Sequence, residues 1–364
     1  MSTVVLAILA LELMILVHEL GHLIVAKRVG ITVHTFAIGF GPRLWAVTRG
    51  ETTYALNLLP IGGYVNMAGE DLDARQPEVA PDRSFRTKSV GARLAVVCAG
   101  PVMNFLLAVL LLGVIAVTFG VAIAVSTRVG TLLSGYPAAK AGLRPGDVII
   151  AIDGRPMRDG EEIVRTIHSS NPNPPATLPT NSQPVYGRTL ALLIRRDGSQ
   201  LEIHVATQYD ARQRVWLTGF SPSVIRERLD PVRALGWGVV TTGRDIAAYL
   251  SAIGGLAMSG RLIAELSGPV AAVRVLGQAA QSGAEYFLYI TAFFSIIIGL
   301  FNLFPLPALD GGRAAFLIVE GLRRRPVDPR REGYIHLVGL ALLLCLIIAL
   351  TVRDIIHPIH IPLP

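Results

Sequence analysis

Cysteine and charge are both scarce in this sequence. Only two of the 364 residues are cysteines, Cys98 and Cys345, and no CxxC pair occurs. This argues against a disulfide framework and against a thiolate metal site. Charged residues make up 16% of the chain, against about 25% in soluble domains, while 52% are hydrophobic. The composition argues against an ordinary soluble enzyme, and also against intrinsic disorder, which needs low hydrophobicity and high charge.

The excess of positive charge lies beside apolar runs. The chain has 33 Lys and Arg against 26 Asp and Glu, which gives a formal net charge of +7. A nucleic-acid-binding protein would gather this excess on one face, often with interleaved aromatic residues. Arginines that flank apolar segments are instead typical of membrane topology. We therefore expect membrane lipid, and no nucleic acid, as a partner.

Four segments are apolar enough, and long enough, to span a bilayer, which takes about 20 residues. They cover roughly residues 3–26, 93–123, 286–306 and 334–352. Clusters of Lys and Arg follow the first segment, precede the second and lie between the third and fourth. The positive-inside rule places all three clusters in the cytoplasm. Both termini and residues 124–285 are then predicted on the extracytoplasmic side.

Two further apolar segments are not expected to span the membrane. Residues 52–67 are β-prone and are interrupted by Pro60, Gly62 and Gly63. We expect a β-hairpin that dips into the membrane beside protein, because irregular backbone at that depth must be shielded from lipid. Residues 229–265 carry the pair Arg244-Asp245 near their middle. This predicts an amphipathic helix at the outer membrane surface.

Residues 124–215 are predicted to form a small soluble α+β domain. Apolar runs typical of strands, separated by Asp-Gly turns, occur at 148–152, 190–194 and 201–205. A helix is expected over 161–167. Residues 169–187 contain five prolines together with Asn, Ser and Thr. We interpret this stretch as a flexible insertion.

The clearest chemical signal is the run His18-Glu19-Leu20-Gly21-His22 in the first apolar segment. Residues i and i+4 of a helix share a face, so both imidazoles can bind one zinc ion while the intervening glutamate activates water. Ionisable residues inside a membrane span are costly and are functional by default. The alternative is a set of hydrogen-bonded polar residues within a helix bundle.

A zinc site with two histidines needs a third protein ligand and an open position for water. Asp310, within residues 302–312, is the candidate. It lies three residues before Arg313, and His22 lies five residues before Lys27, so both are predicted near the cytoplasmic ends of their spans. The prolines and glycines around Asp310 indicate unwound backbone that lines a cavity. The alternative role for Asp310 is to cap a loop.

Taken together, these residues resemble the site-2 protease family of intramembrane zinc metalloproteases, and within it the bacterial regulator-of-sigma-E type. The resemblance covers nearly the whole chain. Besides the two motifs above, it is carried by GFGP at 39–42, LPIGGYV at 59–65, GPVMNF at 100–105 and LSGPV at 266–270. The family's fold is a polytopic α-helical membrane protein with four transmembrane helices, a membrane-reentrant β-hairpin over about 52–67, and an inserted α+β PDZ domain.

The resemblance also implies roles for individual residues. His18, His22 and Asp310 would bind one zinc ion, and Glu19 would be the catalytic general base. The hairpin would pair with unfolded substrate by strand addition, a general mode of peptide recognition. Substrate-binding roles are implied for Asn302, Asn104, Pro60, Gly62, Gly63 and Tyr64. For Asn302 and Asn104 the alternative is hydrogen bonding between helices.

Residues 136–154 resemble part of a PDZ domain, which would bind a peptide C-terminus by β-augmentation or act as a size filter. The implied organisation is a membrane core over 1–123 and 286–364, a PDZ domain over 124–215, and interfacial helices over 216–285. The implied activity is regulated intramembrane proteolysis in the bacterial inner membrane. Its substrates would be single-span proteins already cut outside, such as anti-sigma factors or signal-peptide remnants.

Two interpretations without proteolysis remain open. A PDZ membrane scaffold with a structural zinc leaves Glu19 unexplained, and structural zinc sites usually have four protein ligands. A metal transporter predicts further acidic or His residues in the remaining spans. The second and fourth spans have none at their centres. His336 lies near the start of the last span, and His357 and His360 follow that span; all three are interpreted as exposed residues.

Overall fold

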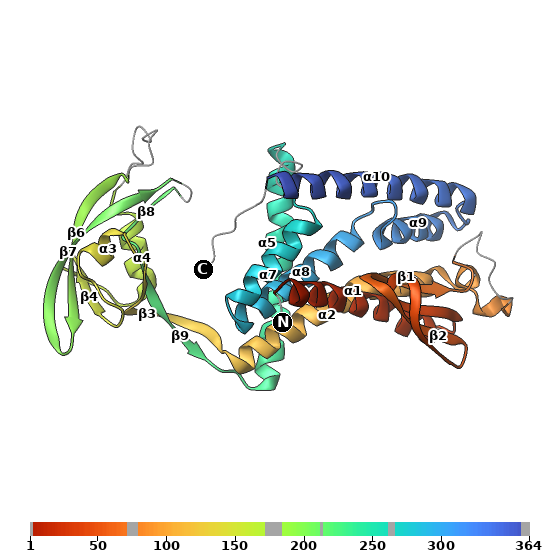
Figure 1. Cartoon of the computed structure of the whole chain (residues 1–364), viewed down its shortest axis with the longest axis horizontal. Coiled ribbons are helices and arrows are strands. Elements are labelled where there is room, and N and C mark those ends of the chain that lie inside the picture. Colours follow the sequence, from red (N-terminus) through yellow and green to blue (C-terminus); the bar gives the residue numbers. More distant parts are fainter. Residues whose placement is uncertain (1–2, 71–78, 172–183, 212–213, 261–265, 358–364) are drawn as a thin grey trace. The chain divides into compact units, whose positions relative to one another are not determined.

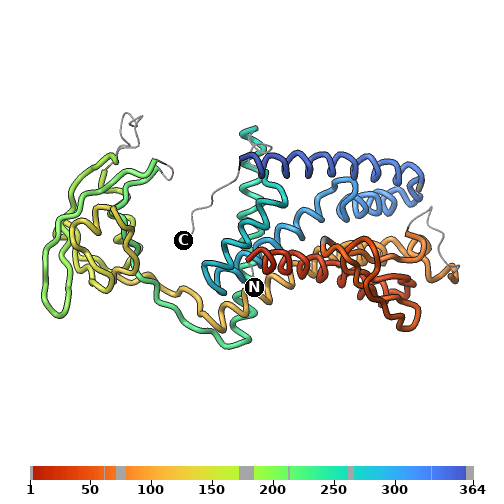
Figure 2. The backbone as a smooth tube through the Cα atoms, viewed as in Figure 1, coloured from red at the N-terminus to blue at the C-terminus, as the bar shows by residue number. Residues whose placement is uncertain are grey.

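The structure is a computed structural model that describes residues 3–70, 79–171, 184–211, 214–260 and 266–357. The chain forms two compact units, one built from Met1–Thr118 with Asp230–Pro364 and the other from Phe119–Leu229. Figure 1 labels the elements of both units, and Figure 2 traces the backbone through them.

Four helices of the first unit are long and apolar enough to cross a membrane, as predicted: α1 (Thr3–Arg28), α2 (Val90–Thr118), α8 (Ala284–Leu303) and α10 (Pro329–Ile356). Helix α2 packs against both α1 and α8. Gly21 allows α1 to contact α2 closely, because a Cβ at this position would lie 2.4 Å from the Ala99 carbonyl oxygen. Small residues at such contacts let helix backbones approach closely in membranes.

Within the described residues the first unit also contains helices α5 (Pro231–Met258), α7 (Pro269–Gln281) and α9 (Asp310–Arg323). A helix was expected within 229–265, and α5 confirms it. Its first turn is capped by Asp230, whose side chain accepts hydrogen bonds from Val232 N and Arg233 N. Helix α5 packs on α2 and α8, while α7 packs on α1. The short helices η1 (Pro81–Arg83) and η2 (Phe85–Thr87) precede α2.

The first unit also contains a small sheet made of β1 (Val33–Arg49) and β2 (Thr52–Met67), which contacts α1. Both strands bend sharply at left-handed glycines, β1 at Gly39 (φ +78°) and Gly41 (φ +87°), and β2 at Gly62 (φ +100°). Each strand therefore contributes two arms.

The strand β2 does not form the hairpin that was expected over residues 52–67, because its two arms do not pair with each other. They pair with β1, the first through Thr53–Leu56 and the second through Gly63–Met67, and residues 33–38 lie between them. Residues 43–49 pair with the outer side of the first arm. The expectation of one self-paired hairpin is corrected, because an apolar run alone does not specify its partner strand. The second arm, 63–67, pairs with residues 33–38 of β1.

The described part of the second unit is a sheet with two helices. Its strands are β3 (Val121–Leu132), β4 (Val148–Ile152), β5 (Arg155–Pro156), β6 (Tyr186–Arg196), β7 (Ser199–Asp210), β8 (Val215–Leu217) and β9 (Phe220–Glu227), with helices α3 (Pro137–Lys140) and α4 (Gly160–His168). The sheet order is β8-β7-β6-β4-β3-β9, and β5 pairs with β4. The three predicted strands and the predicted helix are present. Residues 172–183 of the expected insertion lie outside the described residues.

The second unit extends beyond the boundary expected at residue 215, because β9 pairs with β3 and brings the chain up to Leu229 into the same unit. Its core is formed by apolar side chains of β4, β6 and α4, including the fully buried Ile152, Ile163 and Leu192. At its edge Arg196 donates two hydrogen bonds of 2.7 Å to the buried Asp147. These bonds hold the pKa of the Asp147 carboxyl below its usual range.

Candidate metal centre

Three candidate ligands converge in the first unit, although 292 residues separate the first from the last. His18 and His22 lie on one face of α1 and are 7% and 8% exposed. Asp310 Oδ2 lies 2.9 Å from His18 Nε2 and 3.3 Å from His22 Nε2. The two Nε2 atoms are 3.1 Å apart. The structure therefore brings the histidine pair and the predicted third ligand together.

A turn between α8 and α9 delivers Asp310. Residues 304–309 contain Pro305 and Pro307, which end α8, and Ala308 adopts a left-handed conformation with φ +74°. Helix α9 then begins at Asp310 itself. Gly311 and Gly312 let the turn lie against the start of α9, because a Cβ would lie 2.2 Å from Phe304 O or 2.3 Å from Leu306 O respectively.

The tautomer of His22 leaves one lone pair directed at the other ligands. His22 Nδ1 lies 2.8 Å from the Val96 carbonyl oxygen, so Nδ1 carries the proton and donates a hydrogen bond to this oxygen. Nε2 then offers its lone pair toward His18 Nε2 and Asp310 Oδ2. Such a hydrogen bond on the far nitrogen is the usual way in which a metal-binding histidine is oriented.

Asn104 on α2 lies beside Nδ1 of His18, as the Val96 carbonyl does beside Nδ1 of His22. It is fully buried, its Nδ2 lies 3.4 Å from His18 Nδ1, and its Oδ1 has no partner among the described residues. A half turn of the amide exchanges the positions of its oxygen and nitrogen. In the exchanged orientation Oδ1 accepts from His18 Nδ1–H, which leaves His18 Nε2 free to bind a metal.

The space between the ligands has the size and chemistry of a zinc site. The ligand atoms all lie within 4.8 Å of one another. Gly100 of α2 faces them, and a Cβ there would lie 2.4 Å from His22 Nε2 and 2.6 Å from His18 Nε2. Two imidazole nitrogens and one carboxylate oxygen are a typical donor set for zinc with an open fourth position. The residues present therefore fit the metal.

Glu19 lies beside the ligands and against the second arm of β2. The Val65 backbone N–H donates a hydrogen bond to its carboxylate. A Cβ at Gly63 would lie 3.4 Å from Glu19 Cγ, so the strand passes close to this side chain. Glu19, the three ligands and residues of this strand line one cavity of about 370 Å³.

The other predicted substrate-binding residues divide into two groups. Asn302, Gly63 and Tyr64 line this cavity, and Asn302 Nδ2 donates to Ile298 O at 3.0 Å. Pro60, Gly62 and Asn104 do not line it. The Gly62 N–H donates instead to Glu12 Oε2 on α1, at 3.2 Å, which ties the bend of β2 to the helix.

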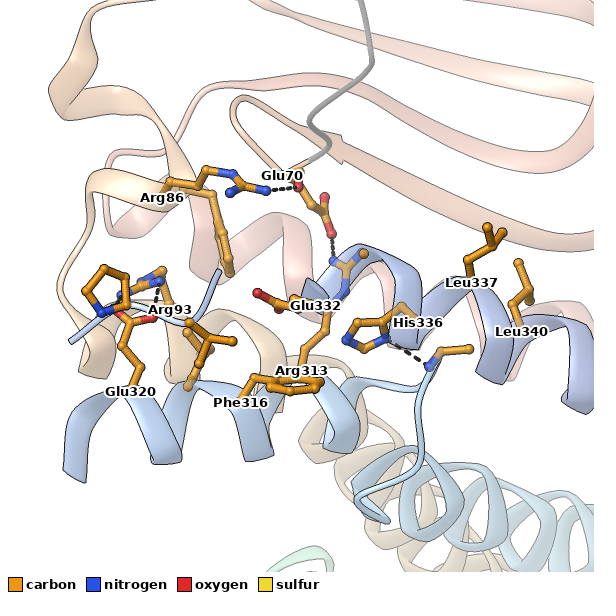
Figure 3. A pocket seen from close by; sticks show the side chains of 16 residues that line it. Glu70, Arg86, Arg93, Arg313, Phe316, Glu320, Glu332, His336, Leu337 and Leu340 are labelled. Atoms are coloured by element: carbon orange, nitrogen blue, oxygen red, sulfur yellow. Dashed lines mark hydrogen bonds and ion pairs between the residues drawn. The ribbon is translucent and has the colours of Figure 1, made fainter. Parts of the chain in front are cut away.

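A second cavity of about 730 Å³ adjoins the first, and the two share Glu70, Ala308 and Arg313. Figure 3 shows it, with Arg313 paired to Glu70 and Arg93 paired to Glu320. His336 of α10 also lines this cavity. The interpretation of His336 as an exposed residue is wrong, because the ring is half-buried and its Nδ1 accepts a hydrogen bond from Ala308 N at 2.9 Å.

Long apolar helices around a His-Glu-x-x-His helix, with a carboxylate beside both histidines, are typical of a membrane-embedded metalloprotease. The sequence model of peptidase family M50 matches residues 6–346, and the chain belongs to this family. The resemblance to the site-2 proteases is thereby confirmed. The protein is a zinc metalloprotease with zinc as its cofactor, and it is a multi-pass bacterial membrane protein.

Relatives of similar length support this assignment. The chain is 33% identical to a Clostridium acetobutylicum protein named as a candidate zinc metalloprotease, over 98% of each chain. It is 30% identical to the zinc metalloprotease RasP of Geobacillus kaustophilus, over 93% of this chain and 94% of that one. It is 28% identical to the regulator of sigma-W protease RasP of Bacillus subtilis, over 97% and 98% respectively.

Proposed function

We propose that the chain is an intramembrane endopeptidase in which His18, His22 and Asp310 hold the zinc ion and Glu19 is the general base. The observation that carries this proposal is that all four residues line one cavity together with Gly63, Tyr64 and Val65 of the second arm of β2. One substrate segment in this cavity could reach the candidate base, the candidate ligands and the strand.

The chemistry follows from the positions of these side chains. When bound, zinc supplies the Lewis acidity that activates water near neutral pH and polarises a carbonyl. Glu19 takes the proton from the attacking water and passes it to the leaving amine. The Val65 N–H holds the Glu19 carboxylate in place. Asn104 and Val96 fix the two histidine tautomers, through His18 and His22 respectively.

Substrate binding is proposed to occur by strand addition to residues 63–67. Gly63, Tyr64, Val65 and Met67 of this arm line the cavity, and the arm pairs with residues 33–38 of β1. An extended substrate segment is proposed to lie along the cavity side of the arm, as in other β-augmentation complexes. An intact substrate helix hides its carbonyls, so the segment must unwind before cleavage. Asn302, which lines the same cavity, is proposed to contact the substrate backbone.

The sheet is proposed to enter the membrane from the cytoplasmic side. The far end of the sheet exposes large apolar side chains: Phe40, Leu44, Trp45, Leu58 and Leu59, each between 47% and 61% exposed. Exposed apolar patches of this kind mark membrane or protein contacts. The clusters of Lys and Arg beside the spans support a cytoplasmic-side site, with the two termini and residues 119–229 on the extracytoplasmic side.

Residues 119–229 are proposed to be the PDZ domain, which either binds a peptide C-terminus or excludes bulky ectodomains. The proposed substrates are single-span membrane proteins of the anti-sigma-factor or signal-peptide-remnant type, already shortened outside by another protease. The name of the Bacillus subtilis relative, a regulator of sigma-W, supports the anti-sigma class. Cleavage would release a cytoplasmic fragment.

The test is cleavage of a tagged single-span substrate in membranes by wild type and by Glu19→Gln, compared at equal zinc content. We expect the variant to retain zinc and to lose cleavage. Glu161→Gln, an exposed change on α4 in the second unit, is the matched control and should cleave normally. Equal cleavage by Glu19→Gln would refute the assigned base. If zinc-loaded wild type cut no substrate in a panel of shortened single-span proteins, the scaffold alternative would replace the proposal.

A further inference from the structure

Helix α10 touches the metal centre only indirectly, through the turn that precedes Asp310. His336 Nδ1 accepts a hydrogen bond from Ala308 N at 2.9 Å, which Figure 3 marks with a dashed line. One turn further along α10, a Cβ at Gly339 would lie 2.2 Å from Pro307 Cβ and 2.9 Å from Pro307 C. The helix backbone therefore lies directly against this turn. Further along, α10 exposes apolar side chains such as Leu342 and Leu344.

The hydrogen bond stabilises an unfavourable backbone conformation. Ala308 has φ +74°, in the left-handed region that residues with a Cβ rarely adopt. Its N–H points toward α10 and not into the turn. A residue in such a conformation persists only where surrounding contacts hold it. Asp310 follows two residues later, so the conformation of Ala308 determines the direction from which α9 and its first carboxylate enter the site.

The position of the His336 ring is determined by this bond and by packing. Its Nε2 is buried without a hydrogen-bond partner among the described residues, so this atom does not orient the ring. Phe316 packs against the ring with centroids 5.6 Å apart. Because Nδ1 accepts a hydrogen bond from Ala308 N–H, the ring is neutral and its own proton is on Nε2.

We propose that His336 is a positioning residue for Asp310: its Nδ1 holds the turn 304–309 in the conformation that aims the carboxylate at the two histidines. The fourth span would thereby contribute to metal binding without providing a ligand. The proposal rests on the proposed function, in which Asp310 is a zinc ligand.

The experiment measures zinc affinity of the purified full chain in detergent by competition with a chelator. Asn places an acceptor near the position of Nδ1, whereas Gln places it near Nε2. We expect His336→Gln to weaken zinc binding by about tenfold, the lower end of the range for residues that orient ligands. His336→Asn should bind zinc close to wild type. Leu344→Phe on the exposed side of α10 is the control and should leave the affinity unchanged.

A second measurement separates positioning from general destabilisation. With Co²⁺ in place of zinc, the visible spectrum reports the ligand geometry. His336→Gln should alter this spectrum and His336→Asn should restore it. Ala308→Gly adopts the left-handed conformation at little cost, so it should partly restore zinc affinity when combined with His336→Gln.

The possible outcomes distinguish this inference from the proposed function. If Asp310→Asn leaves zinc affinity unchanged, Asp310 is not a ligand and the proposed site itself fails. If Asp310→Asn weakens zinc but His336→Gln binds zinc and gives a Co²⁺ spectrum like wild type, the positioning role is wrong. Equal losses in the Gln and Asn variants, with no recovery on Ala308→Gly, would also overturn it, because they would show a role for the ring alone.

Discussion

Gly100 offers a sharp test of the metal centre because it is not itself a ligand. It lies on α2 opposite the two histidines, and a Cβ there would lie 2.4 Å from His22 Nε2 and 2.6 Å from His18 Nε2. Zinc–nitrogen bonds are about 2.0–2.1 Å long. The methyl group of Gly100→Ala would therefore compete with the metal for the same space.

The size of the effect follows from these distances. Ordinary contact begins at 3.4 Å, so each histidine nitrogen must move by about 1 Å. Metal sites tolerate deviations of about 0.2 Å, and a misplacement of 1 Å can reduce catalysis about 100-fold. In the helix itself alanine is more favourable than glycine by about 1 kcal/mol, so the fold should not be weakened by helix propensity. We expect at least about a 100-fold loss of zinc affinity and of kcat/KM.

The assay compares zinc affinity, cleavage rate and melting temperature of the detergent-solubilised chain. Gly113→Ala is the matched control, since it lies on the same helix and its Cβ would meet nothing nearer than 3.7 Å. It should bind zinc and cleave as wild type does. If Gly100→Ala binds zinc and cleaves as well as Gly113→Ala, then α2 does not approach the histidines as closely as described.

Three further predictions concern the second unit, a helix cap and the metal. Arg196 lowers the pKa of Asp147, so the stability this carboxylate provides is complete above its unfolded pKa of about 3.9 and is lost as pH falls through the lower folded pKa. Asp147→Asn should destabilise residues 119–229 by about 2 kcal/mol and reduce their sensitivity to acid, measured by hydrogen exchange on the full chain; an unchanged acid profile would contradict this. Asp354 Oδ2 accepts from Gly268 N and Ala271 N, each at 3.0 Å, so Asp354→Ala should destabilise the start of α7 by about 1–3 kcal/mol. Its melting temperature in detergent should fall, and equality with wild type would argue against the cap. Removal of zinc with a chelator should abolish cleavage of the model substrate, and added zinc should restore it; activity that survives complete removal would contradict a zinc-dependent reaction.

Local patterns in the sequence were sufficient for the spans and for the histidine pair. The hydropathy of each spanning helix is contained within its own residues, and all four predicted spans are present. His18 and His22 share a face because they are four residues apart on one helix. Asp310 could be proposed as their partner from its chemistry and its expected depth. Its 2.9 Å approach to His18 depends on the turn before α9.

The pairing of strands could not be predicted from local patterns in the same way. The run 52–67 is recognisable as β-prone, yet its two arms lie on either side of residues 33–38. Similarly, β9 belongs to the second unit because it pairs with β3, more than 80 residues earlier. Strand partners are chosen by the hydrogen-bonding edges that folding brings together, and a strand's own residues carry little of that information.

Hydrophobicity and the helical repeat act over short stretches of chain, so the class of protein, its four apolar helices and the candidate residues for the chemistry could be predicted from the sequence alone. The contacts around those candidates follow from the folded structure. Gly100 lies where a Cβ would be 2.4 Å from His22 Nε2, and the Ala308 N–H donates to His336 of another helix. These contacts join residues far apart in the chain, and their distances are set by packing, which no single segment encodes.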